Sequence, residues 1–426
     1  MILFTAEFTA FLSTTIISNV VIDTNNDALM RINFNITVMD MPCEFATIDI
    51  VDILGTRSDN VSKNVHKWHV DESGVRRGFE GRNLVQKDLL HDEHHDLDLL
   101  HANGMHAVPM DETSFTNHIN NHQYTFANFY APWCIWCQRL EPVYEALAEA
   151  VEAQQLPISI VKIDCVENKD LCMNYKIQAF PTLRLFKKAE VQPPDYRSDR
   201  TVDAFIEFLK DKLQLDEEVA KMGAREQAEH MRRLKTADHP GCMMTGFLLV
   251  NRVPGNFHIE ARSKHHNLNP KMANISLIVN HLSFGNVLSS SQLKKLKSVP
   301  EEYFSLESTK PFDGNVYMTK ELHQAYHHYI KVVSSHLDLG GKYRGKNAIL
   351  AYQMVQSSQV MQYEEDEVPE ARFSYDLSPM SVSVKRISTS TWYQFITSIC
   401  ALIGGTFTVF QLVSSGLGVI FKAKKI

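Results

Sequence analysis

A long uncharged segment near the C-terminus sets the first limit on how this chain can fold. No charged residue occurs between Ile387 and Phe421, and a helix needs only about 20 apolar residues to cross a bilayer. Trp392 and Tyr393 lie near one end of this segment, as aromatic side chains do at a membrane interface. The alternative is a buried core helix. The length and position favour a transmembrane helix over 391–421, and the basic flanks weakly favour a cytosolic tail at 422–426.

The first twelve residues are also apolar, but they are too few to span a bilayer. Glu7 interrupts them and they have no basic n-region, so they make a poor signal peptide. They fit the distal half of a membrane helix whose start is missing. We therefore expect the chain to be truncated at its N-terminus.

Length, charge and cysteine content narrow the function classes. At about 150 residues per domain, a chain of 426 residues allows about three domains. The net charge of −7 does not match the basic footprint of a nucleic-acid-binding protein, so no nucleic-acid partner is expected. Seven cysteines are too few for a disulfide-held scaffold. Their positions are therefore more informative than their number.

Two kinds of pattern alternate along the chain. β-branched runs predict strands in the first 55 residues and again after Cys242, whereas residues 111–215 alternate between strand and helix. A charged connecting helix is expected over 216–238. This order predicts one β-rich region that is split by a complete inserted α/β domain.

Residues 57–110 are polar and show no sustained periodicity. The stretch from His91 to His106 is rich in histidine and aspartate, and a metal site is one interpretation of it. A solvated linker over 86–110 is the interpretation that we prefer. We expect neither a metal nor a cofactor.

The chemical motif of the chain is the pair Cys134 and Cys137, which follows a predicted strand and opens a predicted helix. A helix N-terminus lowers the pKa of a thiol because its dipole and free N–H groups stabilise the thiolate. Two intervening residues leave the second sulfur close enough to resolve a mixed disulfide. Zinc ligands use the same spacing, but no second pair lies at a suitable distance. We predict that Cys134 is the exposed nucleophile and Cys137 the resolving thiol.

Residues 111–215 resemble a thioredoxin domain of the protein disulfide isomerase type. The motifs FYAPWC, RLEPVYEALA and Phe180-Pro181-Thr182 occur in the order of that family. The resemblance implies that Pro181 is a cis proline facing the active-site sulfur. It implies that Arg200 swings toward the resolving cysteine, although a charge at an exposed helix start is the alternative. It also implies a structural disulfide between Cys165 and Cys172, with two buried free thiols as the alternative.

Two positions depart from the isomerase pattern. Ile135-Trp136 stands where many isomerases have Gly-His, so a cationic partner of the thiolate is lost and the dithiol should be less oxidising. Asn128 stands where the family usually has a buried carboxylate that accepts the proton of the resolving thiol. An amide cannot take that proton, so we expect slower resolution.

The flanking regions resemble the ERGIC/Erv family, whose members cycle between the endoplasmic reticulum and the Golgi in COPII vesicles as cargo receptors. The resemblance rests on several separate segments in order: VVIDTNNDALMRINFNITVMDMPC, GCMMTGFLLVNRVPGNFHI, VNHLSFG, YDLSPM and TSICALIGGTFTVF. The combination is similar to the membrane-anchored disulfide isomerases of plants and protists. Cys43 and Cys242 fall in these motifs, but the sequence does not pair them. Cys400 lies in the membrane segment and should be inert.

The expected fold class is therefore an α+β multidomain membrane protein, with a thioredoxin domain between β-rich Erv-type luminal segments and a C-terminal transmembrane helix. The expected parts are an Erv-type N-terminal region (1–85, with 1–12 as a remnant of a first membrane helix), the linker (86–110), the thioredoxin domain (111–215), the connecting helix (216–238), an Erv-type β-rich domain (239–390), the transmembrane helix (391–421) and the tail (422–426).

Further signals fit a luminal chain in the endoplasmic reticulum or the ER–Golgi intermediate membrane. Asn35, Asn60 and Asn274 begin glycosylation sequons. Lys422 and Lys424 resemble a dilysine retrieval signal, although a basic flank that stops the helix is the alternative.

The expected function is thiol–disulfide exchange on secretory cargo by an enzyme of the protein disulfide isomerase type. The alternative is an ER–Golgi cargo receptor or adaptor whose thioredoxin domain binds clients with little redox turnover. The expected partners are secretory clients with thiols or disulfides, COPI and COPII coat components on the tail, the lipid bilayer and another Erv-type protein.

Overall fold

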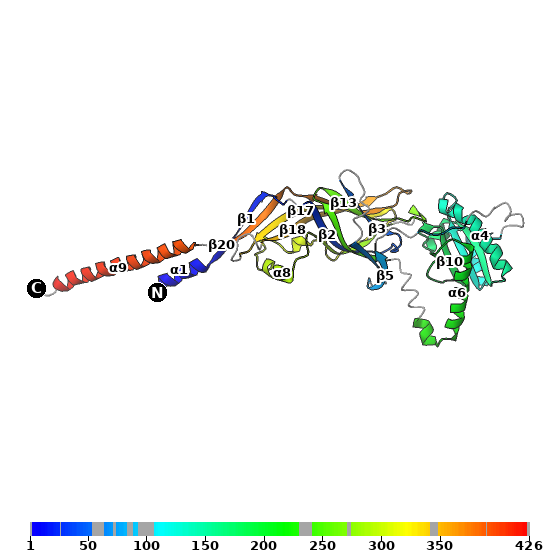
Figure 1. Cartoon of the computed structure of the whole chain (residues 1–426), viewed down its shortest axis with the longest axis horizontal. Helices are drawn as coiled ribbons and strands as arrows, with labels where there is room; N and C mark the ends of the chain where they lie inside the picture. Colours follow the sequence, from blue (N-terminus) through cyan, green and yellow to red (C-terminus); the bar gives the residue numbers. More distant parts are fainter. Residues whose placement is uncertain are drawn as a thin grey trace.

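The computed structural model describes residues 2–25, 27–52, 64–70, 74–82, 88–92, 106–229, 241–270, 274–340, 348–388 and 390–423. The molecule is elongated (Figure 1). Two helices lie at one end, β-sheets form the middle, and a smaller α/β unit lies at the other end. These three parts follow the change of pattern along the sequence.

Two large sheets form the middle of the molecule. The first has the order β1-β20-β17-β19-β13-β3 with β18 beside β17, and the second has the order β16-β15-β2-β12-β4-β5. Their apolar faces share one core that contains Phe34, Phe257 and Phe373. The strands are β1 (Thr14–Ile22), β2 (Leu29–Val38), β3 (Ala46–Asp52), β4 (Val65–Val70), β5 (Arg76–Arg82), β12 (Cys242–Asn251), β13 (Gly255–Ala261), β15 (Leu277–Phe284), β16 (Asn315–Tyr317), β17 (Gln324–Asp338), β18 (Ile349–Gln362), β19 (Glu370–Leu377) and β20 (Met380–Ser388). The short helix α8 (Ser290–Leu296) lies beside them.

Strands from before and after the α/β unit pair with each other. β2 pairs antiparallel with β12, and β3 pairs antiparallel with β13. A disulfide between Cys43 and Cys242 joins the same two parts of the chain across 199 residues of sequence. The prediction of a β-rich region that is split by an insertion is therefore confirmed.

The inserted unit is a five-stranded sheet of order β11-β10-β7-β8-β6 covered by helices. Helix α6 begins after the N-cap Thr201 and packs against α4. Its apolar residues Phe205 and Leu209 are fully buried in a core with Phe126 and Tyr144. The elements are β6 (Val108–Pro109), α3 (Glu112–Asn121), β7 (Tyr124–Tyr130), α4 (Ile135–Ala153), β8 (Ile158–Asp164), α5 (Lys169–Asn174), β9 (Ala179–Phe180), β10 (Thr182–Lys187), β11 (Glu190–Val191) and α6 (Val202–Lys221).

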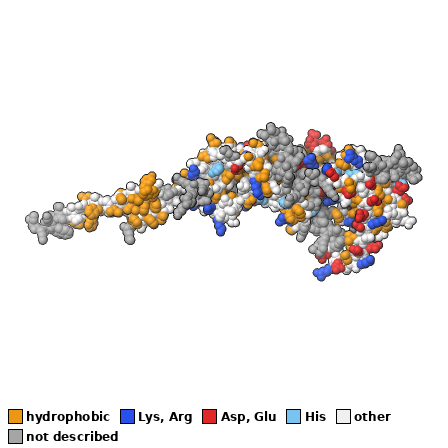
Figure 2. Space-filling model, in the orientation of Figure 1, with side chains coloured by type: hydrophobic (Ala, Val, Ile, Leu, Met, Phe, Trp, Pro, Cys, Tyr) orange, Lys and Arg blue, Asp and Glu red, His pale blue; other side chains and the backbone are white. Residues whose placement is uncertain are grey.

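The two terminal helices leave the sheets side by side. β1 pairs antiparallel with β20, so α1 (Ile2–Leu12) and α9 (Trp392–Ala423) emerge together, and the rings of Phe11 and Phe395 stack at 4.4 Å. Within the described residues, one segment is long and apolar enough to cross a membrane, and it runs from Trp392 to Ser415. None of this segment is buried inside the protein, and many of the side chains described at this end are hydrophobic (Figure 2). An exposed helix that is apolar all round fits a lipid environment.

The structure differs from the sequence prediction in two segments. β4 and β5 pair as an antiparallel hairpin, although no strand was expected in this part of the chain. Register shifts at Lys67/Trp68 and His69/Val70 break the two-residue periodicity of this hairpin. Helix α6 also crosses the expected boundary at residue 215 without a break. Asp216 explains this continuation, because its carboxylate accepts hydrogen bonds from Lys187 and Tyr124 on the sheet.

A buried ion pair fixes the centre of the α/β unit. Glu145 of α4 is 1% exposed and its Oε1 lies 2.8 Å from Nζ of Lys162 on β8. Its Oε2 accepts hydrogen bonds from the backbone N–H groups of His106 and Ala107. Burial works to raise the pKa of Glu145, but these hydrogen bonds and Lys162 outweigh it and hold the pKa below its ordinary value.

We expect Glu145→Gln to lower the free energy of unfolding by about 3 kcal/mol, because it leaves Lys162 without its buried partner. Glu141→Gln is the matched control, since Glu141 is half exposed and lies 3.5 Å from Lys162; it should cost less than about 1 kcal/mol. Denaturant unfolding measures both. Equal losses of unfolding free energy in the two variants would show that the buried Glu145–Lys162 pair stabilises the fold no more than the exposed Glu141–Lys162 contact.

We also expect a pH dependence from His328 on β17. It is fully buried, Nδ1 lies 2.7 Å from Oγ of Ser358, and its ring stacks on Phe373. Burial lowers the pKa of His328 to about 3, whereas an unfolded histidine titrates near about 6.5. Its stabilising contribution is therefore complete above pH of about 6.5 and is lost as the pH falls toward the folded value.

The free energy of unfolding should fall by up to about 1.4 kcal/mol per pH unit below that point on account of this residue. The variant His328→Gln should flatten the slope between neutral and acidic pH by that amount. Denaturant unfolding of both chains across this range is the measurement. Identical slopes would contradict the assignment.

Candidate active site

Cys134 and Cys137 lie at the junction of β7 and α4, as the sequence predicts. Cys134 is the N-cap residue of α4, and its Sγ accepts a hydrogen bond of 3.1 Å from the backbone N–H of Cys137. The two cysteines form a disulfide with their Cα atoms 5.2 Å apart. A thiolate at this position would be stabilised by the free N–H groups and the dipole of the helix.

The segment that contains Pro181 faces this disulfide. The Phe180–Pro181 peptide bond is cis. The carbonyl oxygen of Phe180 lies 3.5 Å from Sγ of Cys134. The ring of Trp133 packs edge-on against Phe180 and is 53% exposed. Phe180 and Trp133 therefore form an apolar surface beside the Cys134 sulfur.

The sequence analysis expected Cys134 to be exposed, but the structure shows that it is buried. Its exposed fraction is 0%. The sulfur is enclosed by the Phe180 carbonyl, and β9, which ends at Phe180, is itself paired with the short strand β14 (Asn267–Leu268) of the Erv-type region. The motif around Cys134 gives no sign that a segment so distant in the sequence pairs with β9.

Arg200 is held by the same distant segment. It is 3% exposed, so the alternative of a surface charge at the helix start is wrong. Its Nη2 donates a hydrogen bond of 2.7 Å to the carbonyl oxygen of His265, and its backbone N–H donates to the carbonyl of Leu90. Burial lowers the pKa of Arg200 to about 10. In this conformation the guanidinium is engaged by the Erv-type region.

Two histidines from outside the motif surround Trp136. The ring of His265 meets Trp136 edge-on at 5.4 Å, and the ring of His91 lies 5.8 Å from it. Burial, followed by the charge of Arg200, lowers the pKa of His91. Sequence analysis missed both contacts, because His91 lies 43 residues and His265 131 residues from Cys134 in the chain. The other residues of the linker from 93 to 105 lie outside the described residues.

Asn128 is buried beneath the site without a carboxylate function. It is 4% exposed and its Oδ1 has no hydrogen-bond partner among the described residues. Lys162, its neighbour across β7 and β8, is paired with Glu145 instead. Sequence analysis also missed Glu145, because RLEPVYEALA contains two glutamates, Glu141 and Glu145, and the local pattern does not show which of them is buried.

Cys165 and Cys172 also form a disulfide, with Cα atoms 5.7 Å apart. It borders a cavity of about 590 Å³ that Trp133 and Phe180 also line. Asn269 and Pro270, together with Glu365 and Asp366, contribute the opposite side from the Erv-type region. An open, largely apolar space therefore lies next to the buried dithiol.

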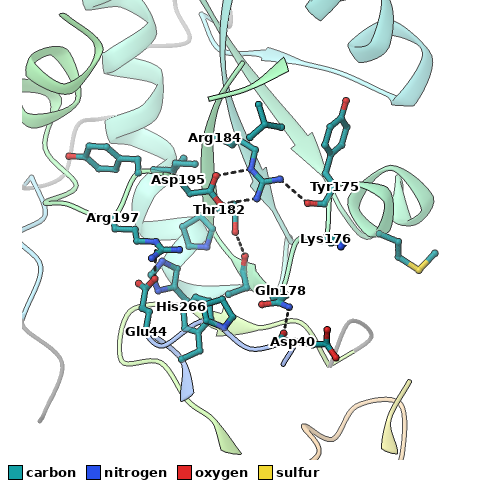
Figure 3. Close-up of a pocket in the computed structure, with 18 of the residues that line it drawn as sticks. Asp40, Glu44, Tyr175, Lys176, Gln178, Thr182, Arg184, Asp195, Arg197 and His266 are labelled. Carbon is teal, nitrogen blue, oxygen red and sulfur yellow. Dashed lines mark hydrogen bonds and ion pairs between the residues drawn. The ribbon is translucent and has the colours of Figure 1, made fainter. Parts of the chain in front are cut away.

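A second cavity, of about 630 Å³, lies between the two parts of the molecule (Figure 3). Arg184 pairs with Asp195 at 2.7 Å on its thioredoxin side. Across the interface Arg197 pairs with Glu44 at 3.0 Å, and Nε2 of Gln178 donates to the carbonyl of Asp40 at 2.7 Å. These contacts fasten the strand that leads to Pro181 onto the Erv-type sheets.

Among the described residues, one group has the composition of a metal site. It consists of Asp49, His258 and Glu260 on the paired strands β3 and β13. Arg262 lies 3.3 Å from Asp49, and Nε2 of His258 lies 3.8 Å from Glu370. Asp49 already has a cationic partner in Arg262, so we assign no metal to this group.

The predicted glycosylation sites and the predicted retrieval signal stay predictions. Asn35 lies on β2, where its side chain is half-buried, and Asn274 lies just before β15. Asn60 and Lys424 lie outside the described residues, and Lys422 lies in the last turn of α9.

Comparisons with known proteins match the chain in three consecutive parts. The matching families are the Endoplasmic Reticulum-Golgi Intermediate Compartment (ERGIC) family over 1–59, Thioredoxin over 106–211, and Endoplasmic reticulum vesicle transporter over 208–414. Protein disulfide-isomerase 5-4 of Arabidopsis thaliana is 28% identical, with 97% of this chain and 88% of that protein aligned. Protein disulfide isomerase-like 5-4 of Oryza sativa subsp. japonica is 29% identical over the same shares.

Solved structures match different parts of the chain. The crystal structure of Erv41p aligns with 86% of this chain and 99% of its own, at 14% identity and a TM-score of 0.37. Human ERp44 aligns with 25% of this chain and 29% of its own, at 27% identity and a TM-score of 0.24. The family matches confirm the combination inferred from the sequence. The chain therefore combines a thioredoxin domain with flanking ERGIC- and Erv-type regions, and over nearly its whole length it is similar to disulfide isomerase-like proteins.

Proposed function

We propose that the chain catalyses thiol–disulfide exchange on secretory clients through Cys134 and Cys137. The observation that carries the proposal is the disulfide at the N-terminus of α4, with its Cys134 sulfur 3.5 Å from the residue before Pro181. This arrangement combines a stabilised thiolate with a second sulfur in reach. Cys165–Cys172 and Cys43–Cys242 lie outside such a motif and have structural roles.

The exchange is balanced in either direction. In reduction, the thiolate of Cys134 attacks one sulfur of a client disulfide, and the other client sulfur leaves as a thiolate that takes up a proton. The thiolate of Cys137 then attacks Sγ of Cys134 and releases the second client thiol. The client has gained two electrons and the domain has become the disulfide. In oxidation, the disulfide accepts two electrons from a client dithiol by the reverse steps.

The neighbourhood of the dithiol supports two finer expectations. The residues between the cysteines are Ile135 and Trp136, so no cationic side chain within the motif stabilises the thiolate. Asn128 offers a buried amide where a carboxylate would accept the proton of Cys137. We therefore expect a less oxidising dithiol and a slower resolving step than in an isomerase with both groups.

The proposed setting is the lumen of the endoplasmic reticulum and the ER–Golgi intermediate membrane. Three disulfides support an oxidising compartment for the bulk of the chain. Helix α9 supports an anchor, with the C-terminus in the cytosol, where Lys422 and Lys424 would contact coat components. A second Erv-type protein is the proposed membrane partner. Glycans on Asn35, Asn60 and Asn274 belong to the same proposal.

The alternative is a cargo receptor or adaptor that binds clients with little redox turnover. Two observations favour it: Cys134 is fully buried, and the cavity beside Trp133 is built jointly by the thioredoxin and Erv-type parts. Both functions use the same surface. They differ in whether a covalent intermediate forms.

Trapping separates the two functions. In cells that express Cys137→Ala, we expect client proteins to accumulate as mixed disulfides with Cys134, because the resolving thiol is absent. The matched control is Cys134→Ala/Cys137→Ala, which should trap none. Non-reducing gels followed by mass spectrometry identify the adducts. If the single variant traps no more than the double variant, and insulin reduction by the parent chain does not exceed that of the double variant, the enzymatic proposal fails.

A further inference from the structure

A short segment of the Erv-type region lies on the strand that precedes Pro181. β14 pairs antiparallel with β9, with Asn267 opposite Phe180 and Leu268 opposite Ala179. The backbone N–H of Asn269 donates a hydrogen bond of 2.7 Å to the carbonyl of Gln178. Its side-chain amide donates a second, of 3.1 Å, to the carbonyl of Ile177. The segment 265–269 thus forms a two-stranded ladder with β9, separate from the five-stranded sheet.

The same segment contacts the other side of the dithiol. The carbonyl of His265 accepts the hydrogen bond from Arg200, and the ring of His265 packs edge-on against Trp136. Trp136 directly precedes Cys137, and Phe180 directly precedes Pro181. Residues 265–269 therefore contact the positions that flank the disulfide on both sides.

A client joined to Cys134 must pass along this edge. The Cys134 sulfur lies 3.5 Å from the Phe180 carbonyl oxygen, so a peptide bonded to that sulfur runs beside β9. Extended peptides commonly bind proteins by adding a strand to a sheet edge, where backbone hydrogen bonds supply the affinity. Among the described residues, the strand that pairs with β9 is β14.

We propose that residues 265–269 cover the edge formed by Ala179–Phe180 and Trp136 in the resting chain, and that a client joined to Cys134 displaces them. The proposal rests on the proposed function and says which segment covers the dithiol site when no client is bound. It also accounts for a dithiol motif whose nucleophile is fully buried while the adjacent Trp133 is half exposed.

The position of the segment in the chain allows this displacement. It lies in the connection between β13, which ends at Ala261, and β15, which begins at Leu277. Neither of the two large sheets includes β14. Release of residues 265–269 breaks the contacts with β9, Trp136 and Arg200, and also the ring contacts of His265 with His91 and of His266 with Phe45. The ladders of both large sheets stay intact. Local openings of this kind occur without global unfolding.

The test is the accessibility of Cys134 in the reduced full-length chain. All variants carry Cys137→Ala, and iodoacetamide labelling of the Cys134 peptide is followed by mass spectrometry in detergent. His265→Ala/Asn269→Ala should be labelled at least about tenfold faster than the parent, because losing the Asn269 side-chain hydrogen bond to Ile177 and the ring contact of His265 with Trp136 shifts a local opening equilibrium by such factors. The matched control His281→Ala/Asn280→Ala changes the same residue types on β15 and should label at the parent rate. Equal rates in all three chains would overturn the proposal.

Hydrogen exchange tests the proposal without altering the segment. In the parent chain the amide of Asn269 should be protected by its bond to Gln178. In a chain trapped with a client on Cys134, that protection should be lost, whereas the amides of β13 should be unchanged. Retained protection of Asn269 in the trapped complex would contradict the displacement, even if the double variant fails to fold.

The outcomes distinguish this inference from the proposed function. Faster labelling without any trapped client would remove the enzymatic function and leave the closed site in place. Trapped clients with unchanged labelling and unchanged exchange would leave the enzymatic function in place and remove the internal strand as its cover.

Discussion

The Cys43–Cys242 disulfide is the constraint on which the rest of the structure depends. It closes a loop of 199 residues that contains the entire thioredoxin unit, and in the chain-entropy treatment closing a loop of that length stabilises the folded state by about 5 kcal/mol. Both sulfur-bearing residues are fully buried in the core shared by the two large sheets. The pairings β2–β12 and β3–β13 then build those sheets from strands on either side of the insertion.

The Cys43–Cys242 closure fixes how the thioredoxin unit lies against the Erv-type region. Because the segments before and after the thioredoxin unit are joined in one core, the unit is fixed at two points and its dithiol edge meets the Erv-type region. Arg197–Glu44, Gln178–Asp40 and the β9–β14 pairing fasten the contact. The β1–β20 pairing directs α1 and α9 away together at the opposite end of the molecule (Figure 1). The dithiol is therefore held at the end of the molecule that lies farthest from the helix that would enter the membrane.

Much of this organisation follows from the sequence, because its causes are local. A local sequence pattern predicts each of three features: the strand-then-helix placement of Cys134 and Cys137, the proline at 181, and the uncharged segment that ends at Phe421. The pairing of Cys43 with Cys242 does not, since it depends on sheets assembled across the insertion. The hairpin β4–β5 was missed because bulges break its alternation. The burial of Cys134, the bond from Arg200 to His265 and the contact of His265 with Trp136 depend on chain segments far from the motif.

The central claim is that Cys134–Cys137 is an exchangeable disulfide in a chain whose other two disulfides are structural. The most direct measurement equilibrates the purified full-length chain in glutathione buffers of increasing reducing strength, quenches it with an alkylating reagent and assigns the labelled cysteines by mass spectrometry. Cys134 and Cys137 should become labelled together in a two-electron transition while Cys43, Cys242, Cys165 and Cys172 stay oxidised. A Cys134–Cys137 pair that opens only when all three disulfides open would contradict the claim.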